Sequence, residues 1–285
     1  MIPADFEYHR PASLDQALKL LSSLGEDVKL LSGGQSLVPL MKLRLAKPRH
    51  IIDLGGIAGL NLIRQDGDQI LIGGLTTHTQ IEESELLKRR CPLLPQTATT
   101  IADVQVRNQG TIGGTLAHAD PTSDMPPAIL AVNGEIKVVG PKGERWIKAE
   151  DFFITMLTTA IEPDEVLTEI RVPVQTQHKT AYLKAAQRAS GFAVVGVAVS
   201  LTLNPDNSCQ DIAIGVTGVT YKAYRASNVE DKVRGKKLDS KLIEEAASKV
   251  VEGIDVNEDI NASQEYRSHL ARVYTARAIE AALQS

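Results

Sequence analysis

Two glycine-paired segments carry residue types that could bind a phosphate. The first spans residues 29–41 and reads KLLSGGQSLVPLM, and the second spans residues 110–124 and reads GTIGGTLAHADPTSD. In each, small and hydroxyl side chains surround a Gly-Gly pair. Because glycine has no Cβ and tolerates positive φ, successive backbone amides can converge on an anion. Two such loops facing each other predict a diphosphate site.

Neither segment has the spacing of the common nucleotide motifs. No Gly-Lys-Ser/Thr follows the glycines, as it does in a P-loop, and the G-x-G-x-x-G pattern of dinucleotide folds is missing. A single Gly-Gly pair is most often a turn or a tight crossing of two chain segments. From the residues themselves, both the structural and the anion-binding interpretation stay open.

Two polar residues of the second segment have alternative roles. A carboxylate just past a phosphate loop, such as Asp124, can accept hydrogen bonds from ribose hydroxyls. Asp124 could instead cap a helix that begins at Met125. His118 could contact phosphate or flavin, or it could be a polar loop residue.

The histidines and cysteines show no metal-binding spacing. None of the six histidines occurs in an H-x-x-x-H or H-x-x-E pattern, so we expect no metal site. Cys91 and Cys209 are too few for a disulfide framework or for a cysteine-ligated iron–sulfur cluster. There is no G-x-S-x-G elbow of a serine hydrolase, and we assign no catalytic acid or base.

The composition is that of a globular protein of about two domains. The chain has 285 residues, 43% of them hydrophobic and 23% charged, with a net charge of −4. This charge argues against nucleic-acid binding, which needs a basic face. No apolar run reaches the ~18 residues of a membrane span. With no signal peptide at the N-terminus and few cysteines, we expect a cytoplasmic protein.

The apolar pattern predicts the elements that position the glycine segments. Helices are expected over residues 13–24, 79–88, 92–101, 125–132, 242–251 and 265–283. Strands are expected over residues 28–31, 50–54, 69–75, 135–139, 145–148, 166–172, 181–186, 192–203 and 211–219. Thr79 and Glu82 predict a capping box at the start of the second helix. Residues 102–107 are expected to form a loop leading to the second glycine segment.

The two segments resemble the flavin-binding motifs of the FAD-binding subunit of molybdenum hydroxylases. This family includes the CO dehydrogenase medium subunit and the flavin domain of xanthine dehydrogenase. The likeness rests on GGQSLVPLMKLRLAKP at residues 33–48 and GTIGGTLAHADPTSD at residues 110–124, and it covers essentially the whole chain. Gln35 stands where the CO-oxidising branch often has His, so the likeness is to the broader family.

The resemblance implies an α+β fold. It begins with a two-part FAD-binding domain of the PCMH (vanillyl-alcohol oxidase-like) type over residues 1–174, with subdomains of about 1–55 and 56–174. A C-terminal CO dehydrogenase flavoprotein-like domain follows over residues 177–285, with a three-stranded antiparallel sheet and helices.

The resemblance also implies the residues that hold FAD. In the first segment, Leu30 and Leu31 would flank the adenine, and the segment contributes Lys29, Leu30, Leu31, Ser32, Gly33, Gly34, Gln35, Ser36 and Leu37. The second segment contributes Gly110, Thr111, Gly113, Gly114, Thr115, His118, Ser123 and Asp124. Residues along or beside the flavin ring are Ile101, Ala102, Val166, Leu167, Lys184 and Phe192. The alternative for Lys184 is a surface lysine on an outer strand, and a phenylalanine at position 192 can stack but cannot hydrogen-bond.

The implied function is electron transfer within a larger enzyme. FAD would be bound non-covalently and would pass electrons to an external acceptor. A large partner subunit would carry molybdopterin and a small partner subunit two [2Fe-2S] clusters, in a dimer of heterotrimers. Two alternatives are a stand-alone FAD-dependent oxidoreductase and a non-catalytic nucleotide-binding subunit. The substrate would bind to another chain, and this sequence does not identify it.

Overall fold

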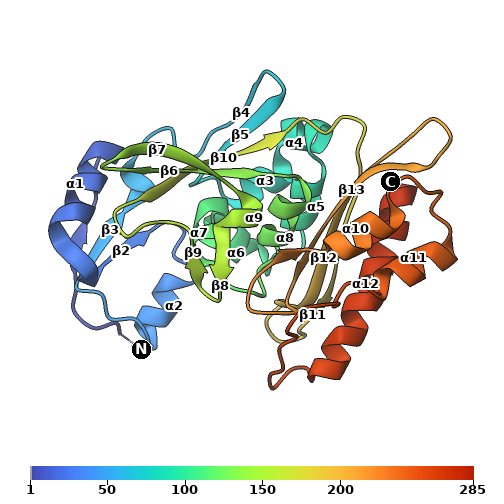
Figure 1. Cartoon of the computed structure of the whole chain (residues 1–285). Coiled ribbons are helices and arrows are strands. Elements are labelled where there is room, and N and C mark those ends of the chain that lie inside the picture. Colours follow the sequence, from blue (N-terminus) through green and yellow to red (C-terminus); the bar gives the residue numbers. More distant parts are fainter. Residues whose placement is uncertain (1) are drawn as a thin grey trace.

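A computed structural model describes residues 2–285, and Figure 1 shows the chain running through three successive sheets. The first sheet is parallel, with strand order β1-β3-β2, formed by β1 (Glu7–His9), β3 (His50–Asp53) and β2 (Val28–Leu31). Helix α1 (Leu14–Leu24) packs Ala17 and Leu21 against this sheet. The helix begins after Ser13, whose side chain accepts the amide of Gln16.

The predicted helix over residues 13–24 and the strand over residues 28–31 are confirmed. Two short 3₁₀ turns, Gly25–Asp27 and Leu54–Gly56, follow α1 and β3. Because β2 ends at Leu31, the first glycine segment lies at its carboxyl end. Helix α2 (Leu37–Lys42) then leads away from this segment.

The central sheet is antiparallel and has the order β4-β5-β10-β6-β7. Its strands are β4 (Ile63–Asp66), β5 (Gln69–Gly73), β10 (Val166–Pro173), β6 (Glu135–Gly140) and β7 (Gly143–Lys148). A small hairpin consists of β8 (Phe153–Thr155) and β9 (Thr158–Thr159). The helices of this part are α3 (His78–Glu83), α4 (Glu85–Arg90), α5 (Leu93–Ala98), α6 (Val104–Gln109), α7 (Ile112–His118), α8 (Met125–Ala131) and α9 (Ala149–Phe152).

Two local predictions in this part are wrong. The capping box is formed by Thr77 and Gln80, two positions before the predicted pair, and Ser84 ends α3 and caps a separate helix α4. Residues 104–109 form helix α6 rather than a loop, because Asp103 caps it by accepting the amide of Val106.

The second glycine pair lies inside a helix, not in a loop. Thr111 caps α7 by accepting the amide of Gly114 at 3.1 Å. A Cβ at Gly113 would lie 2.5 Å from the carbonyl oxygen of Gly74. Tertiary packing therefore requires glycine at position 113, although glycine lowers intrinsic helix propensity.

The C-terminal sheet is antiparallel, with order β11-β12-β13-β14. It consists of β11 (Lys179–Ala186), β12 (Ala193–Leu203), β13 (Cys209–Thr217) and β14 (Tyr224–Arg225), with helices α10 (Ser227–Val233), α11 (Ser240–Ala247) and α12 (Gln264–Gln284). The predicted three-stranded sheet thus gains a fourth strand, whose two residues are too few to show a periodic pattern.

The C-terminal sheet is held directly against the central part. A Cβ at Gly215 would lie 2.0 Å from the carbonyl oxygen of Pro127 in α8, so the sheet and this helix meet at backbone distance. The buried guanidinium of Arg267 in α12 donates to the carbonyls of Val194 and Gly218.

Within residues 2–285, none of the helices has the length and hydropathy to cross a membrane.

Candidate functional site

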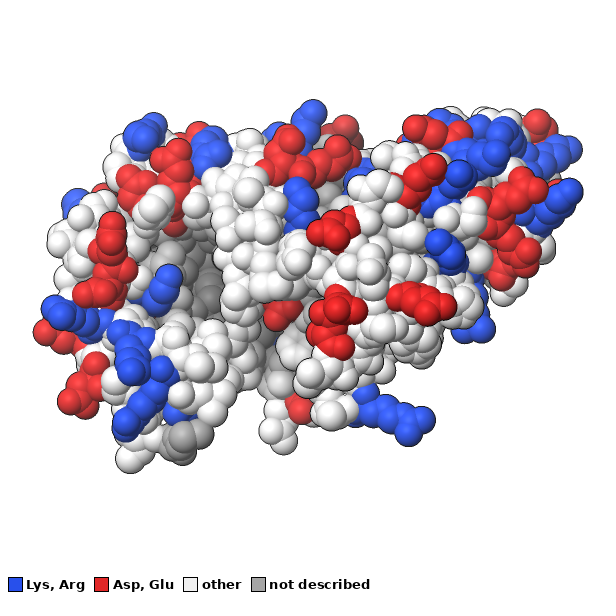
Figure 2. All heavy atoms as spheres, turned by 60° about the horizontal axis from the view of Figure 1, so that its bottom comes forward, with Lys and Arg blue, Asp and Glu red and all other residues white. Residues whose placement is uncertain are grey.

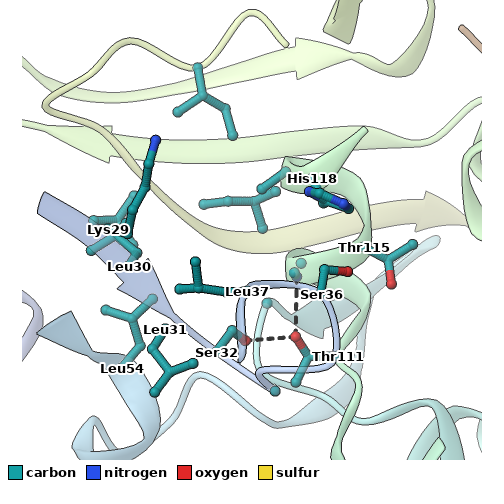
Figure 3. Close-up of a pocket in the computed structure, with 18 of the residues that line it drawn as sticks. Lys29, Leu30, Leu31, Ser32, Ser36, Leu37, Leu54, Thr111, Thr115 and His118 are labelled. Atoms are coloured by element: carbon teal, nitrogen blue, oxygen red, sulfur yellow. Dashed lines mark hydrogen bonds between the residues drawn. The ribbon is translucent and has the colours of Figure 1, made fainter. Parts of the chain in front are cut away.

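The two glycine segments meet side by side (Figure 3). The hydroxyls of Ser32 and Thr111 lie 2.6 Å apart and share a hydrogen bond. A Cβ at Gly33 would lie 2.0 Å from the carbonyl oxygen of Gln109. Since no real Cβ contact is that short, only glycine at position 33 allows this approach.

A cavity of about 530 Å³ lies along this contact. Seventeen of the predicted FAD-binding residues line it: Lys29, Leu30, Leu31, Ser32, Gly33, Gly34, Gln35, Ser36, Leu37, Gly110, Thr111, Gly113, Gly114, Thr115, His118, Val166 and Leu167. Figure 2 shows the molecule hollowed between its N-terminal part and the rest, with both basic and acidic side chains on the N-terminal side. The structure therefore brings most of the predicted set to one cavity.

The first segment supplies free backbone donors to this cavity. Within the part of the chain that the structure describes, the amides of residues 33–36 donate no hydrogen bond, either to backbone or to side chains. Gly34 has φ 73°, a conformation that favours glycine and changes the direction of the backbone. Backbone amides that find no protein partner require a ligand or water.

In the second segment, the backbone amides donate to other groups of the protein. The amide of Ile112 donates to the Thr76 carbonyl, that of Gly113 to the Gly74 carbonyl, and that of Gly114 to the Thr111 hydroxyl. The two segments are therefore not equivalent. The first offers N–H donors to an anion, whereas the second offers side-chain hydroxyls and a close wall.

Apolar side chains form the rest of the cavity. Leu30, Leu31 and Leu54 lie together on one side in Figure 3, and Val166 and Leu167 come from the start of β10. Lys29 and His118 lie on opposite sides of the opening in the same view. Such a cavity suits a ligand with an anionic middle and flat apolar ends.

An acidic loop that precedes β10 also lines the cavity. Glu165 makes a bidentate ion pair with Arg145, with both distances 2.7 Å, and accepts the amide of Glu162. The hydrogen bonds from Arg145 lower the pKa of Glu165. This carboxylate is occupied in fixing the loop, so it is not a free acid or base.

The remaining predicted residues form a second cluster, centred on Lys184. The Lys184 ammonium donates to Asp124 at 3.0 Å, to the Thr100 carbonyl at 2.7 Å and to the Gly191 carbonyl at 2.7 Å. Tyr182 donates its hydroxyl to the other oxygen of Asp124 at 2.5 Å. This cluster does not line the cavity of about 530 Å³.

The structure bears on two of the sequence alternatives. Asp124 is the residue at the N-cap position of α8, as the helix-cap alternative expects, but its side chain makes no capping hydrogen bond. The side chain of Lys184 is only 9% exposed, so it is not a surface lysine. Burial raises the pKa of Asp124, with Lys184 opposing this effect, and burial beside Asp124 raises the pKa of Tyr182 well above 10.

Ile101, Ala102, Ser123 and Phe192 lie in the chain segments that meet at this cluster. Ala102 has φ 39°, an uncommon value for alanine, and a Cβ at Gly191 would lie 3.7 Å from the Ala102 Cα. The Phe192 side chain is 46% exposed. The segment with residues 101–102 and the β11–β12 turn are thus held against each other, with an aromatic ring at the surface.

Two residues of these clusters were not predicted. Tyr182 lies two positions before Lys184, and the alternation of a strand places both on one face, so this signal was present in the sequence. His78 was not identifiable, because only the fold brings its Nε2 to 3.0 Å from the Thr115 hydroxyl. Burial, and secondarily the charge of Arg107, lowers the pKa of His78 to about 4.

Comparison with known proteins identifies the family. Residues 4–175 match the family model described as the FAD binding domain in molybdopterin dehydrogenase. Residues 180–282 match the CO dehydrogenase flavoprotein C-terminal domain. The chain belongs to this family of flavoprotein subunits. The resemblance drawn from the two glycine segments is confirmed, and the chain is a medium FAD subunit of the molybdenum hydroxylase family.

This chain is similar to its relatives along nearly the full length of each. The chain is 39% identical over 280 residues to the glyceraldehyde dehydrogenase medium chain of Sulfolobus acidocaldarius, covering 98% of this chain and 99% of the relative. It is 38% identical over 283 residues to the carbon monoxide dehydrogenase medium chain of Hydrogenophaga pseudoflava, covering 99% and 98%. These near-equal identities belong to enzymes named for different substrates, so identity does not select one.

The fold agrees with solved structures of this family. Carbon monoxide dehydrogenase from Hydrogenophaga pseudoflava superposes with a TM-score of 0.96 at 39% identity, over 100% of this chain and 99% of that chain. Quinoline 2-oxidoreductase from Pseudomonas putida 86 superposes with a TM-score of 0.94 at 30% identity, over 100% and 99%. The α+β fold of an FAD-binding part followed by a flavoprotein C-terminal part is confirmed.

The residues present fit FAD, the cofactor of the family. The amides of residues 33–36 provide N–H donors for a diphosphate, and the leucines of β2 provide an apolar wall for a flat ring. The hydroxyls of Ser32 and Thr111 hold the two walls together. The cavity thus has the donor set and the shape that a dinucleotide requires.

Proposed function

We propose that this chain carries electrons, through bound FAD, from iron–sulfur clusters of a partner subunit to an external acceptor. The free amides of residues 33–36, which line one cavity with the joined hydroxyls of Ser32 and Thr111, support the FAD binding on which this proposal depends. FAD supplies the capacity to take up and release electrons. The chain's own residues bind the cofactor, orient it and exclude water from its apolar parts.

The two glycine segments offer different donor groups to the diphosphate. Residues 33–36 donate from the backbone, while Thr115 contributes a hydroxyl that His78 orients through its 3.0 Å hydrogen bond. Because His78 is neutral at physiological pH, it adds no charge beside the diphosphate. Neither Cys91 nor Cys209 lines the cavity, so no cysteine there can link FAD covalently.

The Lys184 cluster holds the flavin end of the site. Each carboxylate oxygen of Asp124 accepts one hydrogen bond and can accept another, so a contact to the cofactor is compatible with its bonds to Tyr182 and Lys184. We propose that Ile101, Ala102 and Phe192 border the flavin from the same side, and that Ser123 lies by the diphosphate and ribose. The exposed Phe192 ring would cover one edge of it.

The metal cofactors belong to partner chains in this proposal. The two cysteines are buried and belong to different domains, so they do not form the four-cysteine set of a [2Fe-2S] cluster. We propose a small partner with two such clusters, a large partner with molybdopterin, and a dimer of these heterotrimers. Both cysteines are free thiols, which supports a reducing compartment, the cytoplasm.

The face next to α2 is the proposed docking surface for the iron–sulfur partner. Leu43 and Leu45 are 53% and 73% exposed, and Lys42 and Arg44 beside them are exposed as well. On α6, Val104 is 58% exposed. Exposed large apolar side chains next to cations, as in residues 42–45, are typical of an interaction site.

Charge reversal tests this surface. Lys42→Glu with Arg44→Glu should weaken co-purification of the iron–sulfur partner by about tenfold or more, since like charges across an interface cost several kcal/mol. Flavin content should be unchanged. Lys241→Glu with Arg272→Glu, two exposed residues of α11 and α12, provides the matched control. Loss of flavin together with the partner would show that the segment supports the fold instead.

Electron transfer itself is tested by comparing the chain with the complex. The flavin-loaded chain should show no reduction by a candidate substrate, whereas the assembled complex should. Reduction of the isolated chain by substrate would favour the stand-alone oxidoreductase. A chain that binds no FAD after reconstitution would favour the non-catalytic alternative.

A further inference from the structure

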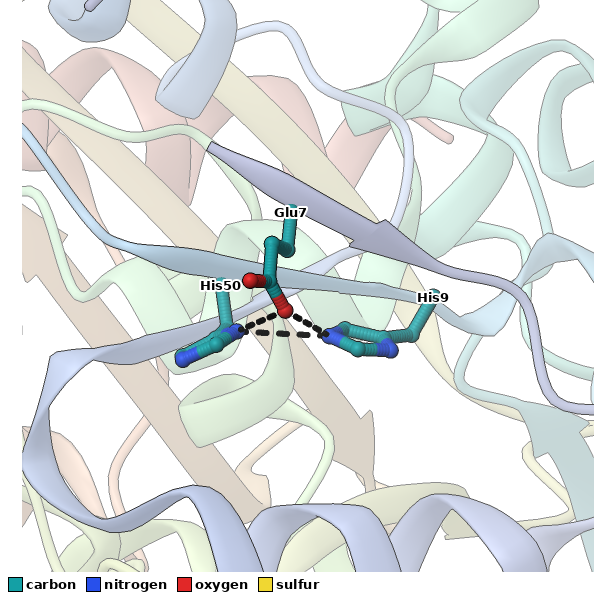
Figure 4. Close-up of side chains that lie close together, drawn as sticks. All are labelled: Glu7, His9 and His50. Carbon is teal, nitrogen blue, oxygen red and sulfur yellow. Dashed lines mark hydrogen bonds and ion pairs between the residues drawn. The ribbon is translucent and has the colours of Figure 1, made fainter. Parts of the chain in front are cut away.

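Two histidines and a glutamate meet on the first sheet, away from the flavin cavity (Figure 4). The His9 Nε2 lies 3.3 Å from the His50 Nδ1, and the Glu7 Oε2 lies 3.4 Å from that Nδ1 and 4.0 Å from the His9 Nε2. His50 is far from Glu7 and His9 in sequence. Their proximity therefore depends on the sheet.

The strand register places the three side chains on one face. Glu7 and His9 are two positions apart on β1, so they point to the same side of the sheet. Strand β1 pairs in parallel with β3, and Glu7 is the partner of His50. Spacing patterns along the sequence could not reveal this cluster, which is why we expected no metal site from the sequence.

Hydrogen bonding accounts for only part of this arrangement. The His9 Nε2 and the His50 Nδ1 lie within hydrogen-bond distance of each other at 3.3 Å, whereas the two distances to the Glu7 Oε2, 3.4 and 4.0 Å, exceed the 2.7–3.2 Å range of ordinary N–H···O bonds. When the His9 Nε2 and the His50 Nδ1 are both unprotonated, their lone pairs and the Glu7 carboxylate converge on one point. A cation at that point would remove the repulsion between them.

The distances have the size of a metal site. The nearest point equidistant from the three atoms lies in their plane, about 2.1 Å from each, as the triangle of 3.3, 3.4 and 4.0 Å requires. This distance matches the bond length of zinc to imidazole nitrogen or carboxylate oxygen. Two imidazoles and one carboxylate form a donor set suited to borderline divalent ions. The side chains of His9 and His50 are 24% and 20% exposed, whereas that of Glu7 is 73% exposed, so an ion could enter from solvent.

We propose that Glu7, His9 and His50 bind one divalent transition-metal ion of the zinc class. The ion is held by three protein atoms and completed by water on the solvent side. It links β1, a three-residue strand at the sheet edge, to the central strand β3. Because β2 pairs with the other side of β3 and leads into the first glycine segment, the ion would stabilise the sheet that positions this segment.

Zinc binding to the untagged, metal-free full chain tests the proposal. Equilibrium dialysis followed by elemental analysis should find one zinc per wild-type chain. His9→Gln and His50→Gln should each weaken binding by about tenfold or more, since losing a ligand costs at least as much as losing a residue that orients one. His269→Gln, which changes an exposed histidine of α12, should bind zinc as the wild type does.

Thermal unfolding and flavin content complete the test. Zinc should raise the Tm of the wild type and of His269→Gln, but not that of His50→Gln, because only a binding-competent native state gains stability from the ligand. An unchanged flavin content in each variant would show that it folds. The proposal is overturned if wild type takes up no stoichiometric zinc, or if His9→Gln and His50→Gln bind it as tightly as the control.

Discussion

At the scale of single residues, the site depends on positions where one atom more or less decides the geometry. Gly33 is such a position, since its added Cβ would lie 2.0 Å from the Gln109 carbonyl. The atoms that this Cβ would meet belong to the backbone and not to the end of a flexible side chain. The two segments themselves would therefore have to separate. The glycine serves the contact between the segments as well as the approach of an anion.

Gly33→Ala should therefore lower FAD affinity strongly and destabilise the chain by about 2 kcal/mol, as overpacking does. Flavin retention after gel filtration and denaturant unfolding measure the two effects. Gly67→Ala is the control, because its φ of 59° strains alanine but nothing lies within 4 Å of the new Cβ. It should lose about 1 kcal/mol and keep its flavin. Full flavin content in Gly33→Ala would contradict the tight contact.

The buried His78 gives a pH dependence of known sign. Its pKa is about 4 in the folded chain and about 6.5 when unfolded, so the unfolded chain binds the extra proton between these values. The contribution of the neutral His78 imidazole to the free energy of unfolding is therefore fully present above pH 6.5 and is lost as the pH falls toward 4. Burial of the imidazole is the main cause, and Arg107 adds to it.

Between pH 7.5 and 5, the wild type should lose about 2 kcal/mol more unfolding free energy than His78→Gln. Urea unfolding at both pH values measures this difference. His269→Gln should behave like the wild type, because this histidine is exposed. Equal pH dependence of wild type and His78→Gln would show that the imidazole is not held neutral.

At the scale of elements, one lysine joins three of them. Lys184 on β11 contacts the residue at the start of α8, the backbone after α5 and the β11–β12 turn. Lys184→Met should cost about 3–5 kcal/mol, since it leaves the Asp124 carboxylate buried without its cation. Chemical denaturation of wild type, Lys184→Met, Asp124→Asn and the double variant would give the coupling energy.

Lys137→Met is the matched control for this change. It breaks an ion pair to Glu144, whose side chain is 61% exposed, and should cost less than about 1 kcal/mol. A similar small loss for Lys184→Met would mean that the cluster contributes little to joining the elements.

The sequence predicted long elements better than the special ones. The helix expected over residues 265–283 and the apolar strand expected over residues 192–203 are long, and the structure shows α12 and β12 over nearly the same residues. The helical state of residues 112–118 was missed, because two glycines oppose helix propensity while packing against Gly74 requires one of them. Short strands such as β1 and β14 carry no periodic signal.

For the site, the likeness of the motifs predicted which residues surround the cavity. It did not predict which of their backbone amides are free and which are hydrogen-bonded within the protein. The free amides of residues 33–36 and the paired amides of Ile112 and Gly113 differ only through tertiary contacts. The separation of the Lys184 cluster from the cavity also arises from the fold. The domain bounds inferred from the likeness, 1–174 and 177–285, stay a prediction to be tested by expressing the parts.

At the scale of the whole molecule, three sheets follow one another along the chain (Figure 1). Residues of the N-terminal and central parts line the cavity of about 530 Å³. The C-terminal sheet closes against α8 and supplies Lys184 and Phe192 near the end of the second glycine segment. The chain thus binds and orients a cofactor, while substrate chemistry belongs to other subunits in our proposal. Its function is therefore best tested by the passage of electrons.

The most direct measurement is anaerobic mixing of the flavin-loaded chain with the chemically reduced iron–sulfur partner, followed by the visible absorbance of the flavin. We predict that the flavin becomes reduced only when the partner is present. Gly33→Ala should show no signal because it carries no flavin. Flavin that stays oxidised in a formed complex, or a chain that takes electrons directly from substrate without any partner, would contradict the account.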